Sequence, residues 1–107
     1  MKTLWIWGEG HFLVDTDIDR FLSYLSVEKG LSQNTLSAYS LDLQKFRAFL
    51  EKVKIHGFNQ VSRKEITLFL ETLQKARLSA NSIARILSAL RTFYKFLSLE
   101  GVMQEDL

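Results

Sequence analysis

The chain has 107 residues, a length that suits one domain with its own hydrophobic core. It contains 47% hydrophobic and 24% charged residues, as soluble globular domains do, and the absence of cysteine excludes disulfides and thiolate metal sites. The net charge of +2 is unevenly distributed: residues 1–31 hold three cations and five acids, whereas residues 32–101 hold eleven cations and five acids. No apolar run is long enough for a membrane span or resembles a signal peptide, so we expect no membrane association and a cytoplasmic location.

Residues 1–14 differ in character from the rest of the chain. Leu4–Trp7 is apolar and rich in residues that favour strands, and Gly8-Glu9-Gly10 interrupts it. A short strand, an arm docked on the domain and a tail outside it all fit this pattern. We predict an N-terminal arm or tail over residues 1–14 and the domain itself over residues 15–107.

The first hairpin begins where Asp15-Thr16-Asp17 supplies short acceptors and negative charge for a helix start. Lys29-Gly30 supplies a cation and a glycine C-cap for its end. Ser32 is the predicted N-cap of a second, longer helix over residues 33–54, and residues 56–59 read as a loop. Apolar residues at helical spacing predict the buried faces of these two helices: Ile18, Phe21, Leu22, Leu25, Leu36, Tyr39, Leu43, Phe46, Leu50 and Val53.

The second hairpin begins at Ser62 and Glu65, which have the spacing of a capping box. A third helix is expected from there to about Ala76, and Ser79 caps a fourth that ends near Glu100. The predicted buried positions are Ile66, Phe69, Leu70, Leu73, Ile83, Ile86, Leu87, Leu90, Phe93, Tyr94 and Leu97. With no proline and no alternating pattern after the N-terminus, the fold class is all-α, a four-helix bundle of two helical hairpins.

An internal repeat supports the two hairpins. Leu31-Ser32-Gln33-Asn34-Thr35-Leu36 corresponds to Leu78-Ser79-Ala80-Asn81-Ser82-Ile83 at an offset of 47. At the same offset Leu43, Phe46 and Leu50 correspond to Leu90, Phe93 and Leu97. Two copies are too few for a solenoid, so we expect the hairpins to pack on each other.

Residues for catalysis or for holding a cofactor do not stand out. His11 and His56 have no carboxylates at ligand spacing, and the glycines are scattered rather than gathered in a phosphate loop. Asp15, Asp17 and Asp19 alternate without the rest of a calcium loop. No serine sits in a nucleophile elbow. We therefore expect this chain to have no enzymatic activity of its own, no metal and no cofactor.

The polar residues at the two turns and along the fourth helix indicate a DNA contact instead. Ser32 and Ser79 first serve as helix caps. The side chains of Asn34, Thr35, Asn81 and Ser82 beside them, with the positive end of the helix dipole, favour the binding of a phosphate. The outer stripe of the fourth helix holds small residues, hydroxyls and cations but no acid: Ser82, Arg85, Ser88, Thr92 and Lys95. The candidate DNA-binding residues are Ser32, Asn34, Thr35, Lys45, Arg47, Ser79, Asn81, Ser82, Arg85, Ser88, Arg91, Thr92 and Lys95.

Arg91 has two interpretations. It lies at the edge of the buried face, and Asp42 lies at a comparable edge of the second helix, so an interhelical ion pair is as good a reading as a DNA contact. We expect Arg85, Ser88 and Thr92 to approach base edges, and Tyr39 and Tyr94 to belong to the core.

Two motif blocks resemble a known family. They are Glu28-Lys29-Gly30-Leu31-Ser32-x-Asn34-Thr35-Leu36-Ser37-Ala38-Tyr39-x-x-Asp42-Leu43 and Ser82-Ile83-Ala84-Arg85-x-Leu87-Ser88-Ala89-Leu90-Arg91-x-Phe93-Tyr94-x-Phe96-Leu97. Both blocks resemble the N-terminal core-binding domain of tyrosine recombinases of the Xer and phage-integrase type. The resemblance covers the chain from about Ile18 to Asp106.

The resemblance implies a SAM-like four-helix domain that forms half of a clamp around double-stranded DNA, with the second and fourth helices toward the major groove. It also implies partners: the catalytic domain of the same parent chain and other recombinase protomers. The catalytic residues of the family lie on that second domain, and none maps onto this sequence. We expect a domain from a longer recombinase, while an accessory protein complete at this length remains an alternative. A helical protein–protein module that does not bind DNA is another.

Overall fold

The computed structural model describes residues 15–101. The predicted arm over residues 1–14 lies outside this described range. Four α-helices make up the domain: α1 (Asp15–Glu28), α2 (Gln33–Lys52), α3 (Arg63–Lys75) and α4 (Ala80–Leu99). The predicted all-α class is confirmed, because residues 15–101 contain helices and turns but no strand.

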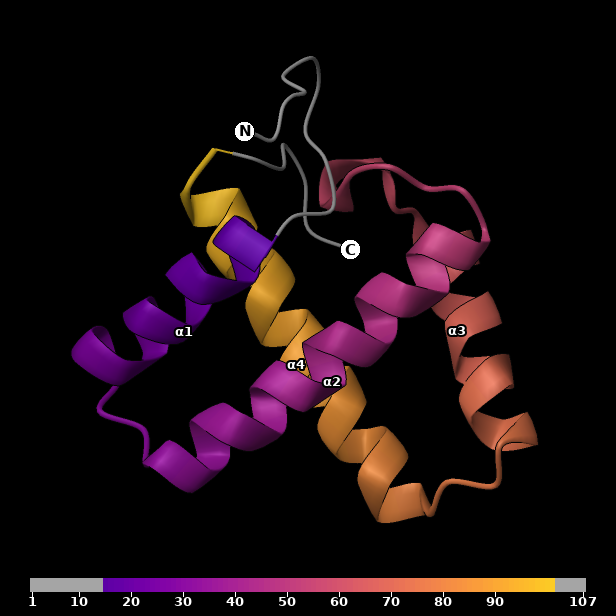
Figure 1. The fold of residues 1–107 in the computed structure, drawn as a ribbon, viewed down its shortest axis with the longest axis horizontal. Coiled ribbons are helices and arrows are strands. Elements are labelled where there is room, and N and C mark those ends of the chain that lie inside the picture. The colour runs from indigo at the N-terminus through magenta and orange to yellow at the C-terminus, as the bar shows by residue number, and fades with distance from the viewer. Residues whose placement is uncertain (1–14, 102–107) are drawn as a thin grey trace.

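The long helices α2 and α4 cross near their middles, and this crossing organises the domain (Figure 1). α1 lies on one side of the crossing and α3 on the other. α2 contacts all three of the other helices and is the central element. The two predicted hairpins, α1 with α2 and α3 with α4, therefore pack on each other through their longer helices.

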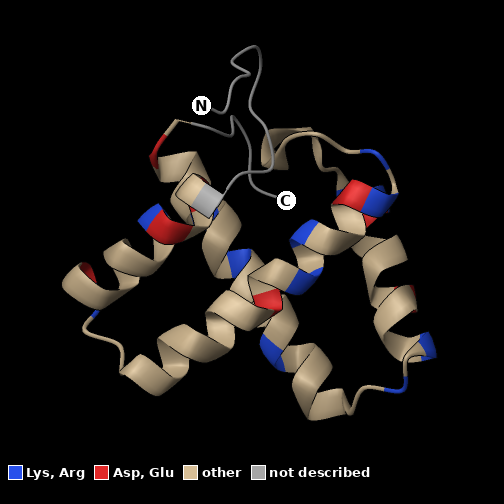
Figure 2. Cartoon of the chain, viewed as in Figure 1, with Lys and Arg blue, Asp and Glu red and all other residues tan. Residues whose placement is uncertain are grey.

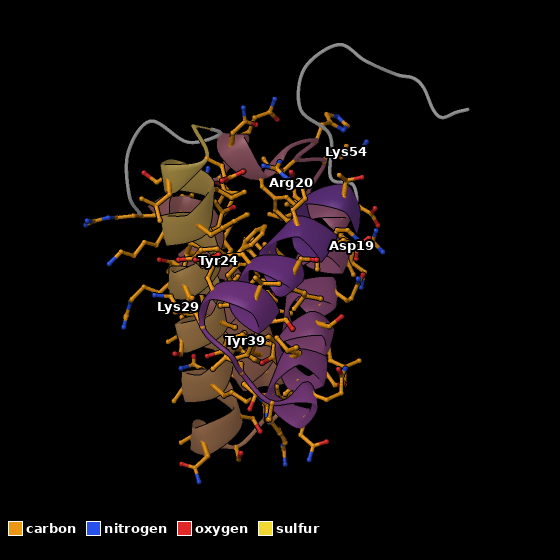
Figure 3. The ribbon with its side chains drawn as sticks, turned by 90° about the vertical axis from the view of Figure 1, so that its left-hand side faces the viewer. Asp19, Arg20, Tyr24, Lys29, Tyr39 and Lys54 are labelled. Atoms are coloured by element: carbon orange, nitrogen blue, oxygen red, sulfur yellow. The ribbon has the colours of Figure 1, made fainter. Side chains whose placement is uncertain are left out.

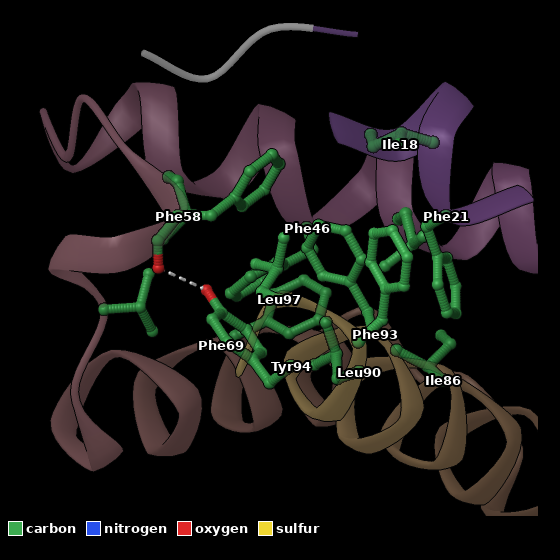
Figure 4. Close-up of a cluster of buried hydrophobic side chains, with 14 of the residues drawn as sticks. Ile18, Phe21, Phe46, Phe58, Phe69, Ile86, Leu90, Phe93, Tyr94 and Leu97 are labelled. Atoms are coloured by element: carbon green, nitrogen blue, oxygen red, sulfur yellow. Dashed lines mark hydrogen bonds between the residues drawn. The ribbon is translucent and has the colours of Figure 1, made fainter. Parts of the chain in front are cut away.

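Aromatic rings from all four helices gather in the hydrophobic core (Figure 4). Phe21, Phe46, Phe69 and Phe93 are all 2% exposed or less. Neighbouring rings meet edge to face or tilted: the Phe21 and Phe93 centroids are 5.3 Å apart, and those of Phe46 and Phe69 are 5.1 Å apart. Such ring pairs add to the burial of apolar area, so this cluster is the main stabilising feature of the fold.

The link between the hairpins differs from the prediction. Residues 58–60 form a single 3₁₀ turn, η1 (Phe58–Gln60), where a plain loop was expected, and Phe58 is completely buried. The Tyr94 hydroxyl donates a 2.8 Å hydrogen bond to the Phe58 carbonyl (Figure 4). Burial raises the pKa of the Tyr94 hydroxyl, which stays protonated and able to donate. α2 also ends at Lys52, so Val53, predicted as core, is its C-cap and is 40% exposed.

The internal repeat is reproduced in the backbone of the two turns. Gly30 and Arg77, 47 positions apart, both have φ of +63°. The following N-caps also match, with φ and ψ of −68° and 158° at Ser32 and of −66° and 157° at Ser79. Because the left-handed conformation suits glycine, Arg77 bears a strain that Gly30 avoids.

Candidate nucleic-acid interface

Both N-cap serines form the predicted capping bonds. Ser32 Oγ accepts from the Thr35 amide at 3.2 Å, and Ser79 Oγ accepts from the Ser82 amide at 3.1 Å. The hydroxyls pair as well: Ser32 Oγ lies 3.0 Å from Thr35 Oγ1, and Ser79 Oγ lies 3.1 Å from Ser82 Oγ. These four hydroxyls are thus engaged within their own turns, which leaves the other helix-terminal amides as donors for an outside acceptor.

The two helix N-termini lie at the same edge of the molecule. Figure 1 shows the turn into α2 and the turn into α4 at its lower edge, on opposite sides of the crossing, and the view turned by 90° in Figure 3 agrees. Neither helix has an acidic residue in its first turn, and Asn34 and Asn81 are exposed there. Two positive helix ends, each with an exposed amide side chain, therefore face the same side.

The exposed stripe of α4 differs slightly from the predicted one. It runs through Asn81, Arg85, Ser88, Arg91 and Lys95, all of which are exposed. The predicted stripe had Ser82 and Thr92, and both of these are half-buried at its edges. Thr92 Oγ1 donates to the Ser88 carbonyl at 2.9 Å, so its proton is already used within the helix.

On α2 the two predicted cations separate. Lys45 is exposed, whereas Arg47 is half-buried. Positions two apart on a helix point about 200° apart, so one surface cannot receive both side chains equally. The exposed line of α2 passes through Asn34, Leu41 and Lys45, and Leu41 is 65% exposed.

The interhelical ion pair exists, but its cation is Arg85 and not Arg91. Arg85 Nε donates to Asp42 Oδ2 at 3.0 Å, and Arg85 Nη2 donates to Asp42 Oδ1 at 2.9 Å. Asp42 lies on α2 where that helix crosses α4, and Arg85 is the α4 cation that reaches this point. Arg91 is six residues further along, about 9 Å up the helix axis and turned by about 240°.

The exposure of the two partners is unequal. The side chain of Asp42 is 1% exposed and that of Arg85 is 47% exposed. The hydrogen bonds from the guanidinium, and the attraction to the carboxylate, raise the pKa of Arg85 above its ordinary value. Arg85, which was expected with Ser88 and Thr92 to approach base edges, is thus also tied to a buried acid.

Arg91 and Lys95 remain as cations on the α4 stripe, and with Lys45 they make no ion pair within the described residues. Arg91 lines a cavity of about 270 Å³ between α3 and α4, together with Arg63 of α3 and the apolar side chains of Leu87, Leu90 and Tyr94. Figure 2 shows Lys and Arg positions on both long helices around their crossing. The sequence of α4 contains no Asp or Glu, so Asp42 brings an acid to this region from α2.

Asp42 was named from the sequence as a possible ion-pair partner and was left out of the candidate DNA-binding residues. Its signal in the sequence was weak, because a single acid between Leu41 and Leu43 reads equally well as exposed polarity. Within residues 15–101, no three His, Cys, Asp or Glu residues come together in a way that would hold a metal ion. None of the described helices is long and apolar enough to cross a membrane.

Comparisons with a family model and with curated proteins point to the same family. Residues 18–101 match the family model described as the phage integrase N-terminal SAM-like domain. A tyrosine recombinase XerC of Anoxybacillus flavithermus is 39% identical over 93 residues, which are 87% of this chain and 31% of the relative. A tyrosine recombinase XerD of Staphylococcus saprophyticus is also 39% identical over 93 residues, 87% of this chain and 32% of the relative. The chain thus spans about a third of the length of these relatives, and no solved structure matches it.

Proposed function

The chain belongs to the phage integrase N-terminal SAM-like domain family, and from this premise we propose that it binds duplex DNA for a site-specific tyrosine recombinase. In this proposal the chain is the DNA-binding domain over residues 15–107. The catalytic domain of the same parent chain supplies strand cleavage and rejoining, and further protomers complete the recombining complex. The relatives are named tyrosine recombinases, and the protein would act in the cytoplasm, where bacterial DNA lies.

The observation that supports this proposal best is the common orientation of two equivalent helix ends. Ser32 and Ser79 cap α2 and α4 in the same conformation, and both helices start at one edge of the molecule (Figure 1). A helix N-terminus presents unpaired amides and a partial positive charge to a phosphate. Because the two ends lie on one side but on opposite sides of the crossing, they suit phosphates at two separate points of a duplex backbone.

The cations of the two helices would add affinity that does not depend on sequence. Lys45, Arg91 and Lys95 are exposed and unpaired within the described residues. Each cation that neutralises a phosphate contributes about −0.9 to the slope of log K against log salt concentration. Three such contacts predict a slope of about −3, to which the helix ends add little because they release few counterions.

A salt series tests the proposal directly. The chain is titrated into a fluorescently labelled duplex and anisotropy is read at several salt concentrations. Arg91→Ala should weaken binding and reduce the slope by about 0.9. Lys54→Ala is the matched control, because Lys54 follows the other end of α2, away from both N-caps (Figure 3). Absent binding, or binding that ignores salt, would instead favour a helical protein–protein module.

The amide side chains offer a second set of variants. Asn34 and Asn81 are exposed in the first turns of α2 and α4, so Asn→Ala there should leave folding intact. We expect each to weaken DNA binding several-fold. Asn59→Ala, in the exposed part of η1, is the control and should change nothing.

A further inference from the structure

The ion pair between Asp42 and Arg85 uses only part of the guanidinium. A guanidinium has five N–H groups in a planar fork. Asp42 takes the Nε proton and one Nη2 proton, at 3.0 Å and 2.9 Å. Within residues 15–101, Asp42 is the only hydrogen-bond partner of Arg85, so the two Nη1 protons and the second Nη2 proton stay available.

The free protons lie on the end of the guanidinium, between Nη1 and Nη2. This end is itself a two-pronged donor with the spacing that suits a pair of acceptors, such as guanine O6 and N7 or two oxygens of one phosphate. Asp42 is buried and Arg85 is half-exposed on the α4 stripe. The carboxylate therefore holds the inner edge of the guanidinium and leaves the solvent-facing part free.

We infer that Asp42 is a positioning residue for DNA recognition, which holds Arg85 so that its free end meets a pair of acceptor atoms on the duplex. The inference rests on the proposed function and adds to it that the cations of α4 have different roles in binding. Arg91 and Lys95, which make no ion pair within residues 15–101, supply charge; Arg85, whose charge Asp42 offsets, supplies geometry. An arginine already held in place loses less conformational freedom on binding than a free one.

The charge of Asp42 gives the inference a test with opposite expectations. Asp42→Asn keeps the size of the side chain but removes a negative charge from the DNA-facing side. If the pair mattered only for charge, this variant would bind every duplex more tightly. If Asp42 positions Arg85 on a base edge, the variant loses affinity for the preferred sequence and keeps or gains affinity for unrelated duplexes. If Asp42 positions Arg85 on a phosphate, the variant loses affinity for every duplex.

The probe is a pool of duplexes with randomised central base pairs, from which the wild-type chain selects its preferred sequences. Anisotropy then measures binding to a selected duplex and to the unselected pool. We expect Asp42→Asn and Arg85→Lys each to lose about tenfold on the selected duplex, because a bidentate arginine contact discriminates by roughly that factor or more. Arg85→Lys keeps the charge and serves as the second variant if Asp42→Asn does not fold, which circular dichroism checks. Asp19→Asn, an exposed acid on α1, is the control.

The two kinds of acceptor give different results. A guanine contact shows as a selected guanine whose replacement by 7-deazaguanine weakens binding by the wild type but not by Arg85→Ala, which has no donor at this position. A phosphate contact shows as a loss on all sequences with a slope smaller by about 0.9 for Arg85→Ala. Undiminished binding of the selected duplex by both folded variants would overturn the inference and leave the proposed function standing. A wild-type chain that binds no duplex would overturn the proposed function as well.

Discussion

Removing Arg85 should destabilise the domain far more than removing an ordinary surface cation. Arg85→Ala deletes both hydrogen bonds to Asp42 and leaves a carboxylate that is 1% exposed without its partner. Hydrogen bonds to charged groups contribute about 1.5–3 kcal/mol each. Because the Arg85 side chain is 47% exposed, water competes for it and screens the pair, so the two bonds together are discounted. We expect a loss of about 2–3 kcal/mol, between a surface pair and a fully buried one.

Urea denaturation followed by circular dichroism at neutral pH measures this loss. Arg91→Ala is the matched control, because Arg91 lies on the same helix, is exposed and has no ion pair within the described residues. It should change the free energy of unfolding by less than about 0.5 kcal/mol. The double variant Asp42→Ala/Arg85→Ala should lose little more free energy of unfolding than Asp42→Ala alone, because removing Arg85 then leaves no unpaired buried carboxylate. A loss below about 1 kcal/mol for Arg85→Ala would refute the reasoning and class the pair with surface ion pairs.

Three further variants test the local features of the fold. Tyr94→Phe removes the buried hydrogen bond to η1 and should cost about 1–2 kcal/mol in the same urea assay, with an unchanged ring cluster. Arg77→Gly relieves a left-handed residue and should stabilise the domain by about 0.5–1 kcal/mol, which a raised melting temperature would show and a lowered one would contradict. Hydrogen bonds from Ser62 lower the pKa of Glu65, so the carboxylate stabilises the fold above the ordinary glutamate pKa of about 4.3, and this contribution disappears as the pH falls through the lowered value. Glu65→Gln should therefore be less stable than the wild type at pH 7 and equal to it in strong acid, and a difference independent of pH would refute this.

The sequence predicted features that depend on neighbours along the chain. Ser32 and Ser79 cap α2 and α4 as expected, and the Ser62 amide donates to Glu65 at 2.7 Å in the predicted capping box. Helical spacing also identified most of the core, because burial follows the 3.6-residue period. These signals are local, and tertiary packing did not override them. The end of α2 was misplaced by two residues, since nothing in the sequence around Val53 marks a stop.

Features that depend on how helices cross could not be predicted in the same way. Spacing places Arg85 and Arg91 on the outer part of α4, but it does not say which of them lies where α2 crosses. The ion pair with Asp42, one of two interpretations of Arg91, is therefore made by Arg85. Phe58 was missed for a related reason: it is buried by contacts with Phe46 and Phe93, which come from two different helices. A short segment with one apolar residue gives no periodic signal.

The proposal that α2 and α4 face DNA is tested most directly by nuclear magnetic resonance. A ¹⁵N-labelled chain is titrated with a short duplex, and amide shifts are followed residue by residue. The account predicts the largest changes at the first turns of both helices, around Asn34 and Asn81, and along α4 at Arg85 and Ser88. Amides of the outer faces of α1 and α3 should move little. Shifts that cluster on α1 and α3, or none at any duplex concentration, would contradict the account.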